Sequence, residues 1–582
     1  MIATYRSFTD KNGSYRELLW LLFASFVIIA IGIGLRSPWP ADEPRFALIA
    51  LEMVNSGEWL FPHRGGELYP DKPPVFVWMQ AIFYLLTGSM QIAFLLPSLL
   101  GALVCVALIY DLAQRFYGQN SGRNAVILLL CTIQFMVQAK LAQIDMTVCM
   151  WITIGNYALL RHFLQGPCWK LYYLGWFAMG LGVITKGVGF LPILLCLPYI
   201  WLLIKQEQCR FNIKSIVQHS VGLIVMLLAI ALWVGPMYYA VEVNQDASYL
   251  AYRDNIMLRQ TAERYVNSLG HQKPFYYYIV SVIPLFWLPL SILLPWLAPR
   301  WFKAIKNGDR LVFLTVIWAI LVLLFFSNSP GKRGVYILPI VPMLVLIAAP
   351  YLDELTANIR IRAIAWVMPL AIATTLISSA LISFFFMPQL LDKLPTEANA
   401  TLLCIIALGG AFLLPTLYWR VRNPIRGAVI SLALGWGIYS VFGYWLMEPT
   451  RSPKDMMAEI NTITGPQSEL AIINFKEQLL LHSERDVVQF GFHTLREKQT
   501  KAAAKWLSEG PEKRWVLSPA EHVEKCFNED SWIDVDTRHR RTWVLVQYSD
   551  LLDREQLINN GCDDFTQTTI PLYHAKPVFL TH

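Results

Sequence analysis

Long apolar runs, separated by short polar segments, occupy most of the first 449 positions of the chain. A membrane-spanning helix needs about 20 mostly apolar residues. Runs near that length, or tolerably short of it, lie at 18–35, 89–114, 121–139, 146–164, 171–185, 187–204, 214–240, 274–298, 310–326, 334–351, 360–386, 398–419 and 426–446. The pattern predicts a polytopic α-helical membrane protein with about thirteen transmembrane helices.

Basic loops set the expected orientation of these helices. The segments rich in Lys and Arg are 115–123, 205–214, 300–310 and 420–426, and further cations precede the first run. If the ambiguous run 75–88 is a juxtamembrane or re-entrant piece, all of these loops face the cytoplasm; if it spans, they lie outside. Because cytoplasmic loops normally carry the excess of Lys and Arg, we do not count the run 75–88 as a span. An odd number of spans then places the C-terminus in the periplasm, if the cell is a Gram-negative bacterium.

Beyond about residue 450 the pattern becomes that of a soluble domain. It predicts strands at 470–475, 487–492, 515–517 and 543–547 and a helix at 495–507. We expect a transmembrane domain over 1–449, with juxtamembrane helices at 40–88, and a periplasmic α/β domain over 450–582. That compartment would permit a disulfide between Cys526 and Cys562, although two free thiols are the alternative.

Composition agrees with this interpretation. The chain is 55% hydrophobic and 15% charged, and its mean hydropathy is +0.43. No soluble domain of this length would carry such values comfortably. The net charge of +7 is therefore attributed to cytoplasmic loops at a membrane, and nucleic-acid binding is excluded.

Polar residues gather on the predicted non-cytoplasmic side. Asp42 and Glu43 precede Pro44 and an apolar stripe that ends at Gly57, a pattern that predicts a short amphipathic helix. Helix capping alone would explain these carboxylates. Arg45, Lys72, Lys332 and Arg333 are suited to holding a phosphate, while Asp42 and Asp145, the latter expected in the turn 140–146, supply carboxylates. Together they fit a lipid-linked phosphosugar.

Two further residues have competing interpretations. Lys186 follows the run 171–185 and would add a phosphate contact, although a lysine at a helix end often only extends toward the membrane surface. His271, in the predicted loop 241–273, could bind a divalent metal (Zn, Mg or Mn) together with Asp71 or Glu67. A lone loop histidine is more often not a ligand, so no cofactor is required by the sequence.

Six short motifs carry a family resemblance. They are Asp42-Glu43-Pro44-Arg45, Tyr69-Pro70-Asp71-Lys72-Pro73-Pro74, Gln143-Ile144-Asp145, Thr185-Lys186-Gly187, residues 271–278 and residues 331–339. In this order the chain resembles the ArnT branch of the protein-mannosyltransferase-like GT-C glycosyltransferases. The resemblance, over residues 17–350, implies transfer of 4-amino-4-deoxy-L-arabinose from undecaprenyl phosphate to lipid A. It also implies a multi-pass protein of the bacterial inner membrane that modifies lipopolysaccharide and supports polymyxin resistance.

The resemblance also implies roles for single residues. Asp42 and Asp145 become the catalytic candidates, with Glu43 beside them, and Asp71 and His271 the metal candidates. The polyprenyl-phosphate pocket would be lined by Arg45, Tyr69, Lys72, Lys186 and Tyr336, with Lys332 beside it. The chain departs from the family at Asp71, where Glu is usual, and in Lys332-Arg333-Gly334-Val335-Tyr336, where Lys-Leu-Pro-Thr-Tyr is usual.

Because of these departures, another polyprenyl-phosphate-linked sugar remains an alternative, with lipid A core, another glycan or a protein as acceptor. A transporter or flippase of lipid-linked sugars is a rival from a different class. It should carry charges near mid-span in two corresponding halves, whereas the charges here lie at one face. A scaffold without chemistry would leave that one-sided cluster unexplained.

Overall fold

The computed structural model describes residues 11–205, 213–257, 272–386, 389, 398–538 and 541–578. The chain divides into two compact units. Unit 1 comprises residues 1–33, 70–76 and 95–444, and unit 2 comprises 34–69, 77–94 and 445–582. The region expected to hold juxtamembrane helices, 40–88, is therefore divided. Residues 40–69 and 77–88 belong to the same compact unit as the C-terminal domain, and 70–76 belong to unit 1.

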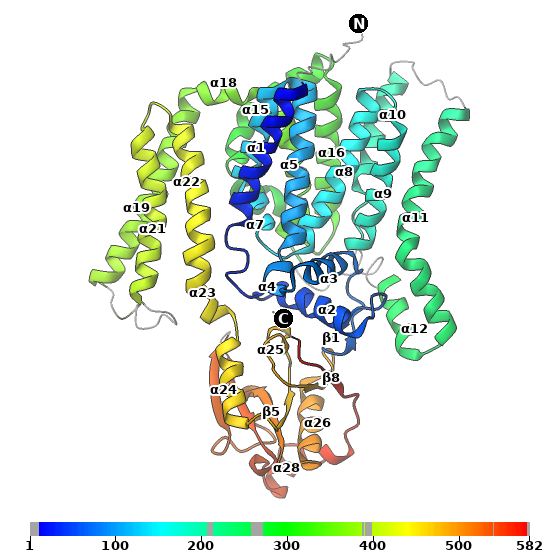
Figure 1. Cartoon of the computed structure of the whole chain (residues 1–582), viewed down its shortest axis with the longest axis vertical. Coiled ribbons are helices and arrows are strands. Elements are labelled where there is room, and N and C mark those ends of the chain that lie inside the picture. Colours follow the sequence, from blue (N-terminus) through cyan, green and yellow to red (C-terminus); the bar gives the residue numbers. More distant parts are fainter. Residues whose placement is uncertain are drawn as a thin grey trace. The chain divides into compact units, whose positions relative to one another are not determined.

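Unit 1 is a helical bundle (Figure 1). Its longer described helices are α1 (Lys11–Ala30), α5 (Leu96–Tyr117), α6 (Gln119–Cys131), α8 (Ile144–Leu164), α9 (Trp169–Lys186), α10 (Cys196–Lys205), α11 (Ile213–Asn244), α15 (Leu290–Lys306), α16 (Arg310–Asn328), α19 (Ile359–Phe386), α21 (Ala398–Trp419) and α22 (Pro424–Ile438). Shorter helices include α7 (Ile133–Ala139), α12 (Ala247–Asp254), α14 (Ile283–Phe286), α17 (Ile340–Ala348) and α18 (Leu352–Ala357). The part predicted as the loop 241–273 is thus helical at 241–244 and 247–254.

Seven of the described helices are long and apolar enough to cross a membrane, or up to nine if each of two bent helix pairs counts as one span. The bent pairs are α6 with α7, at 72°, and residues 278–286 with α15, at 110°. The protein is a multi-pass membrane protein, while the number of thirteen spans stays a prediction. Helix α3 (Val75–Thr87) has 13 residues and reaches only about 20 Å, too short to cross the hydrocarbon core and consistent with leaving 75–88 out of the spans.

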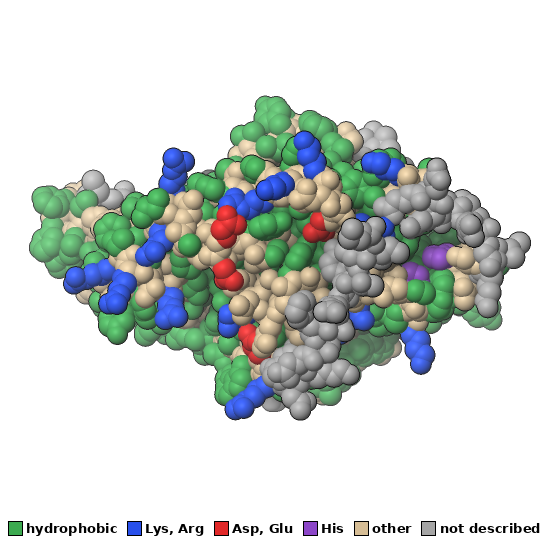
Figure 2. All heavy atoms as spheres, turned by 90° about the horizontal axis from the view of Figure 1, so that it is seen from above, with side chains coloured by type: hydrophobic (Ala, Val, Ile, Leu, Met, Phe, Trp, Pro, Cys, Tyr) green, Lys and Arg blue, Asp and Glu red, His purple; other side chains and the backbone are tan. Residues whose placement is uncertain are grey.

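The basic loops of unit 1 lie at one end of the bundle. They join α5 to α6, α15 to α16 and α21 to α22, and all are at the upper end in Figure 1. Figure 2 looks onto this end and shows many Lys and Arg side chains among few Asp and Glu. The cations of these segments are Arg115, Arg123, Arg300, Lys303, Lys306, Arg310, Arg420, Arg422 and Arg426. The loop before α8 and the end of α9 are at the opposite end.

Unit 2 contains an open six-stranded sheet in the order β6-β7-β5-β3-β4-β8. The strands are β3 (Glu469–Ile472), β4 (Val487–Gln489), β5 (Arg514–Pro519), β6 (Ile533–Arg538), β7 (Arg541–Val546) and β8 (Tyr573–Ala575). Strands β3, β4 and β5 are parallel, and β6, β7 and β8 complete antiparallel pairs. The four predicted strands and the predicted helix, α26 (Arg496–Ser508), are confirmed, whereas β6 and β8 were not expected.

The remaining elements of unit 2 come both from the N-terminal part of the chain and from the segments before and between the strands. They are α2 (Glu43–Ser56), the hairpin β1 (His63–Arg64) and β2 (Glu67–Leu68), α3, α4 (Met90–Ala93), α23 (Tyr444–Arg451), α24 (Lys454–Thr464), α25 (Glu477–Leu480), α27 (Ala520–Val523) and α28 (Arg554–Asn559). Helix α2 has the predicted bounds, because Gly57 takes a left-handed conformation (φ +75°) that ends it.

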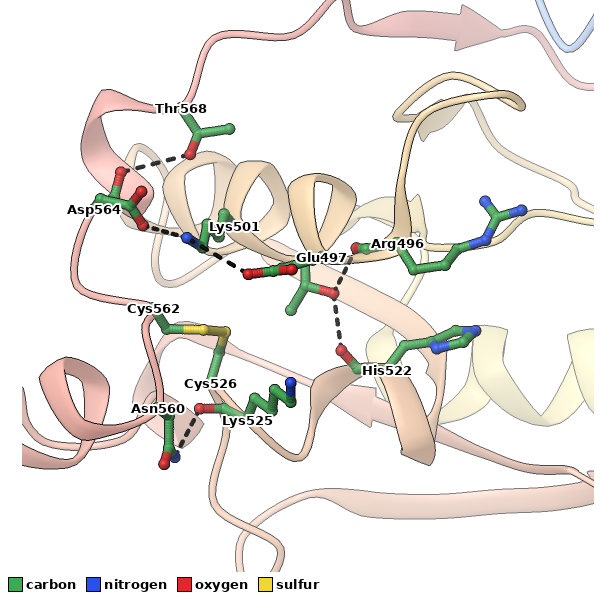
Figure 3. Close-up of a disulfide and its surroundings, with 11 residues drawn as sticks. Arg496, Glu497, Lys501, His522, Lys525, Cys526, Asn560, Cys562, Asp564 and Thr568 are labelled. Carbon is green, nitrogen blue, oxygen red and sulfur yellow. Dashed lines mark hydrogen bonds and ion pairs between the residues drawn. A yellow bond between two sulfur atoms is a disulfide. The ribbon is translucent and has the colours of Figure 1, made fainter.

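A disulfide joins Cys526 to Cys562, 36 positions apart, so the predicted bridge is confirmed. Figure 3 shows it beneath α26, where Lys501 pairs with Asp564 at 2.6 Å. Both sulfurs belong to the core of the sheet domain, with Ala503, Trp506 and Val544. The bridge therefore ties the segment around α28 to the α26 side of the domain.

Candidate active site

The Asp42 side chain pairs with a cation instead of capping a helix. Within the described residues, it accepts no hydrogen bond from the backbone at the start of α2, although it occupies the capping position. Its Oδ1 accepts a hydrogen bond from Arg45 Nη2 at 2.5 Å, and the two side chains are 17% and 23% exposed. The alternative that Asp42 is only a helix cap is therefore not supported by the geometry.

Arg45 links α2 to two other parts of unit 2. Its Nε lies 4.0 Å from Glu477 Oε1 at the start of α25, and it interacts with the buried Tyr69. Burial alone would lower the pKa of Arg45, but the attraction of Tyr69, Glu477 and Asp42 outweighs it and raises the pKa above its usual value. The structure thus brings together three predicted site residues, Asp42, Arg45 and Tyr69.

Glu43 has a structural partner that the sequence did not suggest. Its two oxygens accept hydrogen bonds from both terminal nitrogens of Arg36, and its Oε2 accepts another from the Trp39 amide at 2.9 Å. The Arg36 and Glu43 side chains are 0% and 4% exposed. Glu448 holds the same segment by accepting from Ser37 N and Trp39 Nε1. Glu43 therefore anchors the chain that leads into α2.

A second group of predicted site residues lies in unit 1. Asp145 was expected in the turn before the helix but is the second residue of α8. Lys186 is the last residue of α9. The Lys186 ammonium pairs with the Asp145 carboxylate, and it lies 4.6 Å from the centre of the Tyr336 ring. Their side chains are 15% and 12% exposed. The cluster offers a cation, a carboxylate and an aromatic ring at one end of the bundle.

Local sequence explains how this group forms. Helix α9 ends at Lys186 because Gly187 adopts a left-handed conformation (φ +81°) and its amide bonds back to Val183 O. A cation at a helix C-terminus and a carboxylate in a first turn are both favoured by the helix dipole. Tyr336 follows in the short helix η4 (Gly334–Ile337), where Gln134 Nε2 donates to Gly334 O at 2.8 Å.

Lys332 is directed at backbone carbonyls. Its Nζ donates to Ser329 O at 2.6 Å and to Lys273 O at 2.9 Å, and the residue is 4% exposed. A bridge between Gln272 and Gly331 joins the same two segments. These contacts favour a structural role for Lys332, and its phosphate role stays a prediction.

The metal prediction is not tested. His271 lies outside the described residues, and Asp71 and Lys72 are partly exposed in unit 1. Among the residues that the structure describes, no group of three or more His, Cys, Asp or Glu could hold a metal ion. No step below depends on one.

Sequence reasoning missed Arg36, Glu448 and Glu477. Arg36 and Glu448 are far apart in the chain, so their positions do not show that they hold the same segment. A single charged residue beside an apolar run also gives no indication of its partner. Glu477 had a usable signal, because it follows the buried strand β3. In open α/β sheets, ligand-binding residues gather beyond the carboxyl ends of parallel strands.

Three comparisons place the chain among known proteins. The family described as dolichyl-phosphate-mannose-protein mannosyltransferase matches residues 71–234. The undecaprenyl phosphate-alpha-4-amino-4-deoxy-L-arabinose arabinosyl transferase 1 of Pseudomonas fluorescens is 29% identical over 439 residues, which are 72% of this chain and 74% of the relative. The corresponding transferase of Pseudomonas savastanoi pv. phaseolicola is 27% identical, over 77% of this chain and 80% of the relative.

Among solved structures, ArnT from Cupriavidus metallidurans bound to undecaprenyl phosphate has the same fold. The TM-score is 0.70 at 18% identity, and the match covers 91% of this chain and 98% of ArnT. Fold and sequence relatives together define a membrane glycosyltransferase of the GT-C class. Within that class the chain is ArnT-like, as the six motifs predicted.

Proposed function

We propose that this protein transfers 4-amino-4-deoxy-L-arabinose from undecaprenyl phosphate to lipid A, with inversion at the anomeric carbon, on the periplasmic face of the bacterial inner membrane. The names of the relatives support the donor and the sugar. The basic loops at one end of unit 1, and Asp145 and Lys186 at the other, support the orientation.

The observation that carries the proposal is the cluster of Lys186, Asp145 and Tyr336. A donor phosphate is best held by charge-assisted hydrogen bonds from a cation. Lys186 is suited to that contact, and the Tyr336 ring beside it limits where the ammonium can lie. Asp145 aligns Lys186 and is placed to accept hydrogen bonds from hydroxyl or amine groups of the sugar. We also assign Arg45, Tyr69 and Lys72 to binding of the donor.

Asp42 is the proposed base. The phosphate leaves as an anion and needs little help, so the protein must mainly orient or deprotonate the acceptor on the opposite face of the sugar. Asp42 is partly exposed, and Arg45 beside it favours the carboxylate form. The anchored Arg36–Glu43 pair fixes the start of α2, and with it the direction in which Asp42 points.

A second candidate function is transfer of a different polyprenyl-phosphate-linked sugar. The specific observation behind it is the altered stretch Lys332-Arg333-Gly334-Val335-Tyr336, which includes the start of η4 and ends at the ring that contacts Lys186. A change in this wall would alter the shape offered to the sugar.

Mass spectrometry of lipid A and of other envelope glycans, from cells with and without the gene, tests the proposal. An aminopentose that is present on lipid A only when the gene is intact is the expected result. A hexose or uronic acid difference would favour the second candidate. If lipid A is unchanged while another glycan or a protein changes, the proposal that lipid A is the acceptor is contradicted.

A further inference from the structure

Unit 2 contains a cavity of about 480 Å³ that shares Arg45 with the site described above, while its other lining residues have no role in that reaction. Five cations and one carboxylate line it, together with apolar and aromatic side chains. Ligand pockets for small molecules typically have volumes of about 300–1,000 Å³. The cavity therefore has the size of a ligand site, and its charge is strongly one-sided.

The cations converge because of the sheet topology. Lys476 follows β3, Arg538 ends β6 and Arg541 begins β7. Strand β7 runs antiparallel to β5 and to β6, so these three ends lie at the same edge as the carboxyl end of the parallel strand β3. Ligands of open α/β sheets bind beyond this edge.

The surrounding carboxylates do not balance this charge. Glu477 is shared by Arg45 and Arg64, at 4.0 and 3.8 Å, and Arg45 also pairs with Asp42. Arg538 pairs with Asp536 at 2.5 Å, and Arg541 pairs with the half-exposed Glu521 at 3.2 Å. In the part of the chain that the structure describes, neither Lys476 nor Arg451 lies within 4.0 Å of a carboxylate oxygen. Two cations that line the cavity are therefore available to an anion.

Neighbouring cations destabilise each other's charge. Burial, together with Arg496, Arg541 and Arg64, lowers the pKa of Lys476 against the opposing effect of Glu477. Burial and Arg541 likewise lower the pKa of Arg496, which Figure 3 shows directed to the same side as His522. A bound anion would relieve this repulsion.

The walls of the cavity also suit a sugar. Trp543 and Phe492 supply aromatic surface, and Pro40 and Ala41 bring the segment just before Asp42 to the rim. An aromatic face beside convergent cations matches a ring that carries a phosphate.

We propose that this cavity binds the phosphorylated sugar headgroup of the acceptor. The assignment rests on the proposed function, since lipid A is a phosphorylated saccharide. The donor also carries a phosphate, and the two sources are separated by the transfer experiment below. Placing the acceptor here would put its headgroup next to the residue that precedes the proposed base.

The first test is binding, measured by titration calorimetry on the purified full-length protein in detergent. The probes are glucose 1-phosphate and unphosphorylated glucose. The variants are Lys476→Gln/Arg541→Gln and the control Lys498→Gln, which changes an exposed cation of α26 outside the cavity. Wild type and control should bind glucose 1-phosphate in preference to glucose, and the double variant should bind it about tenfold or more weakly. Equal affinity in the double variant would overturn the cavity as an anion site.

The second test is transfer by the same proteins. The double variant should raise the KM for bisphosphorylated lipid A about tenfold or more, while the KM for the donor stays unchanged. A rise confined to the donor KM would overturn the acceptor assignment. If wild type transfers nothing to lipid A, the proposed function fails, and the binding test alone decides whether the cavity is an anion site. Equal melting curves for wild type and both variants show that folding is intact.

Discussion

At the scale of single residues, two carboxylates are each paired with a cation, and substitutions separate their roles. Asp42→Asn keeps the size of the side chain and a hydrogen-bond acceptor for Arg45 but cannot take a proton. We expect transfer to fall about 10²-fold or more, with donor binding retained, because that is the usual contribution of a general base. The measurement is turnover of purified protein with donor and acceptor both saturating.

Asp145→Asn is the matched comparison for Asp42. It removes the charge that aligns Lys186, so donor binding should weaken more than it does in Asp42→Asn. Wild-type turnover in Asp42→Asn would transfer the catalytic role to Asp145 or to a group outside the described residues.

Lys186 is expected to hold the donor phosphate. Lys186→Gln should raise the donor KM about tenfold or more, since a charge-assisted hydrogen bond contributes about 1.5–3 kcal/mol. Arg45→Ala and Lys72→Ala should act in the same direction. The control is Lys170→Gln, at the exposed opposite end of α9. Donor KM values that are equal in Lys186→Gln and Lys170→Gln would show that Lys186 only terminates the helix.

At the scale of elements, the segment before α2 depends on a buried ion pair. Arg36→Leu or Glu43→Leu alone leaves one buried charge without its partner, and we expect either to destabilise unit 2 by about 3–5 kcal/mol. The double substitution should recover much of that loss, because an apolar pair needs no desolvation of charge. Melting temperatures of the purified proteins measure this.

An exposed ion pair provides the control for that experiment. Glu354 pairs with Arg300 at 2.6 Å at the basic end of the bundle, and its side chain is 67% exposed. Glu354→Gln should change the melting temperature far less. A double variant at Arg36 and Glu43 that is as unstable as the single ones would mean that packing around the pair, and not its charge, holds the segment.

The disulfide is expected to stabilise the sheet domain. Closing a loop of 36 positions removes entropy from the unfolded chain, which in the chain-entropy model raises the free energy of unfolding by about 3–4 kcal/mol. Cys526→Ala/Cys562→Ala should therefore lower the melting temperature of the full-length protein. Alkylation of the denatured, non-reduced protein should label seven of the nine cysteines. Labelling of all nine would rule the bridge out.

At the scale of the whole molecule, orientation in the membrane is the expectation to test. A phosphatase that is active only in the periplasm should be active when fused after Pro449 and inactive when fused after Gly118, between α5 and α6. The basic loops at one end of unit 1 motivate this result. Activity at Gly118 and none at Pro449 would reverse the topology, and equal activity at both would change the parity of the spans.

Much of the fold followed from local pattern. Apolar runs of sufficient length specify membrane helices wherever they fold, so the helical class was predictable. Helix α2 was predictable to its ends, because Pro44 and Gly57 act through backbone geometry within one or two residues. The edge strands β6 and β8 were not, because their pairing is specified by the neighbouring strand and hardly by their own sequence.

The residue types that could bind a phosphate and accept a proton were evident from the chain alone, and so was the family resemblance carried by the six motifs in order. Which of these residues meet depends on the three-dimensional fold. Asp145 and Lys186 are 41 positions apart and Arg45 and Glu477 are more than 400 apart, yet each pair is in contact or close to it. Glu43 became an anchor and Lys332 a cross-link for the same reason: the role of a charged group is set by the partners that remove it from water, and those partners come from distant parts of the chain.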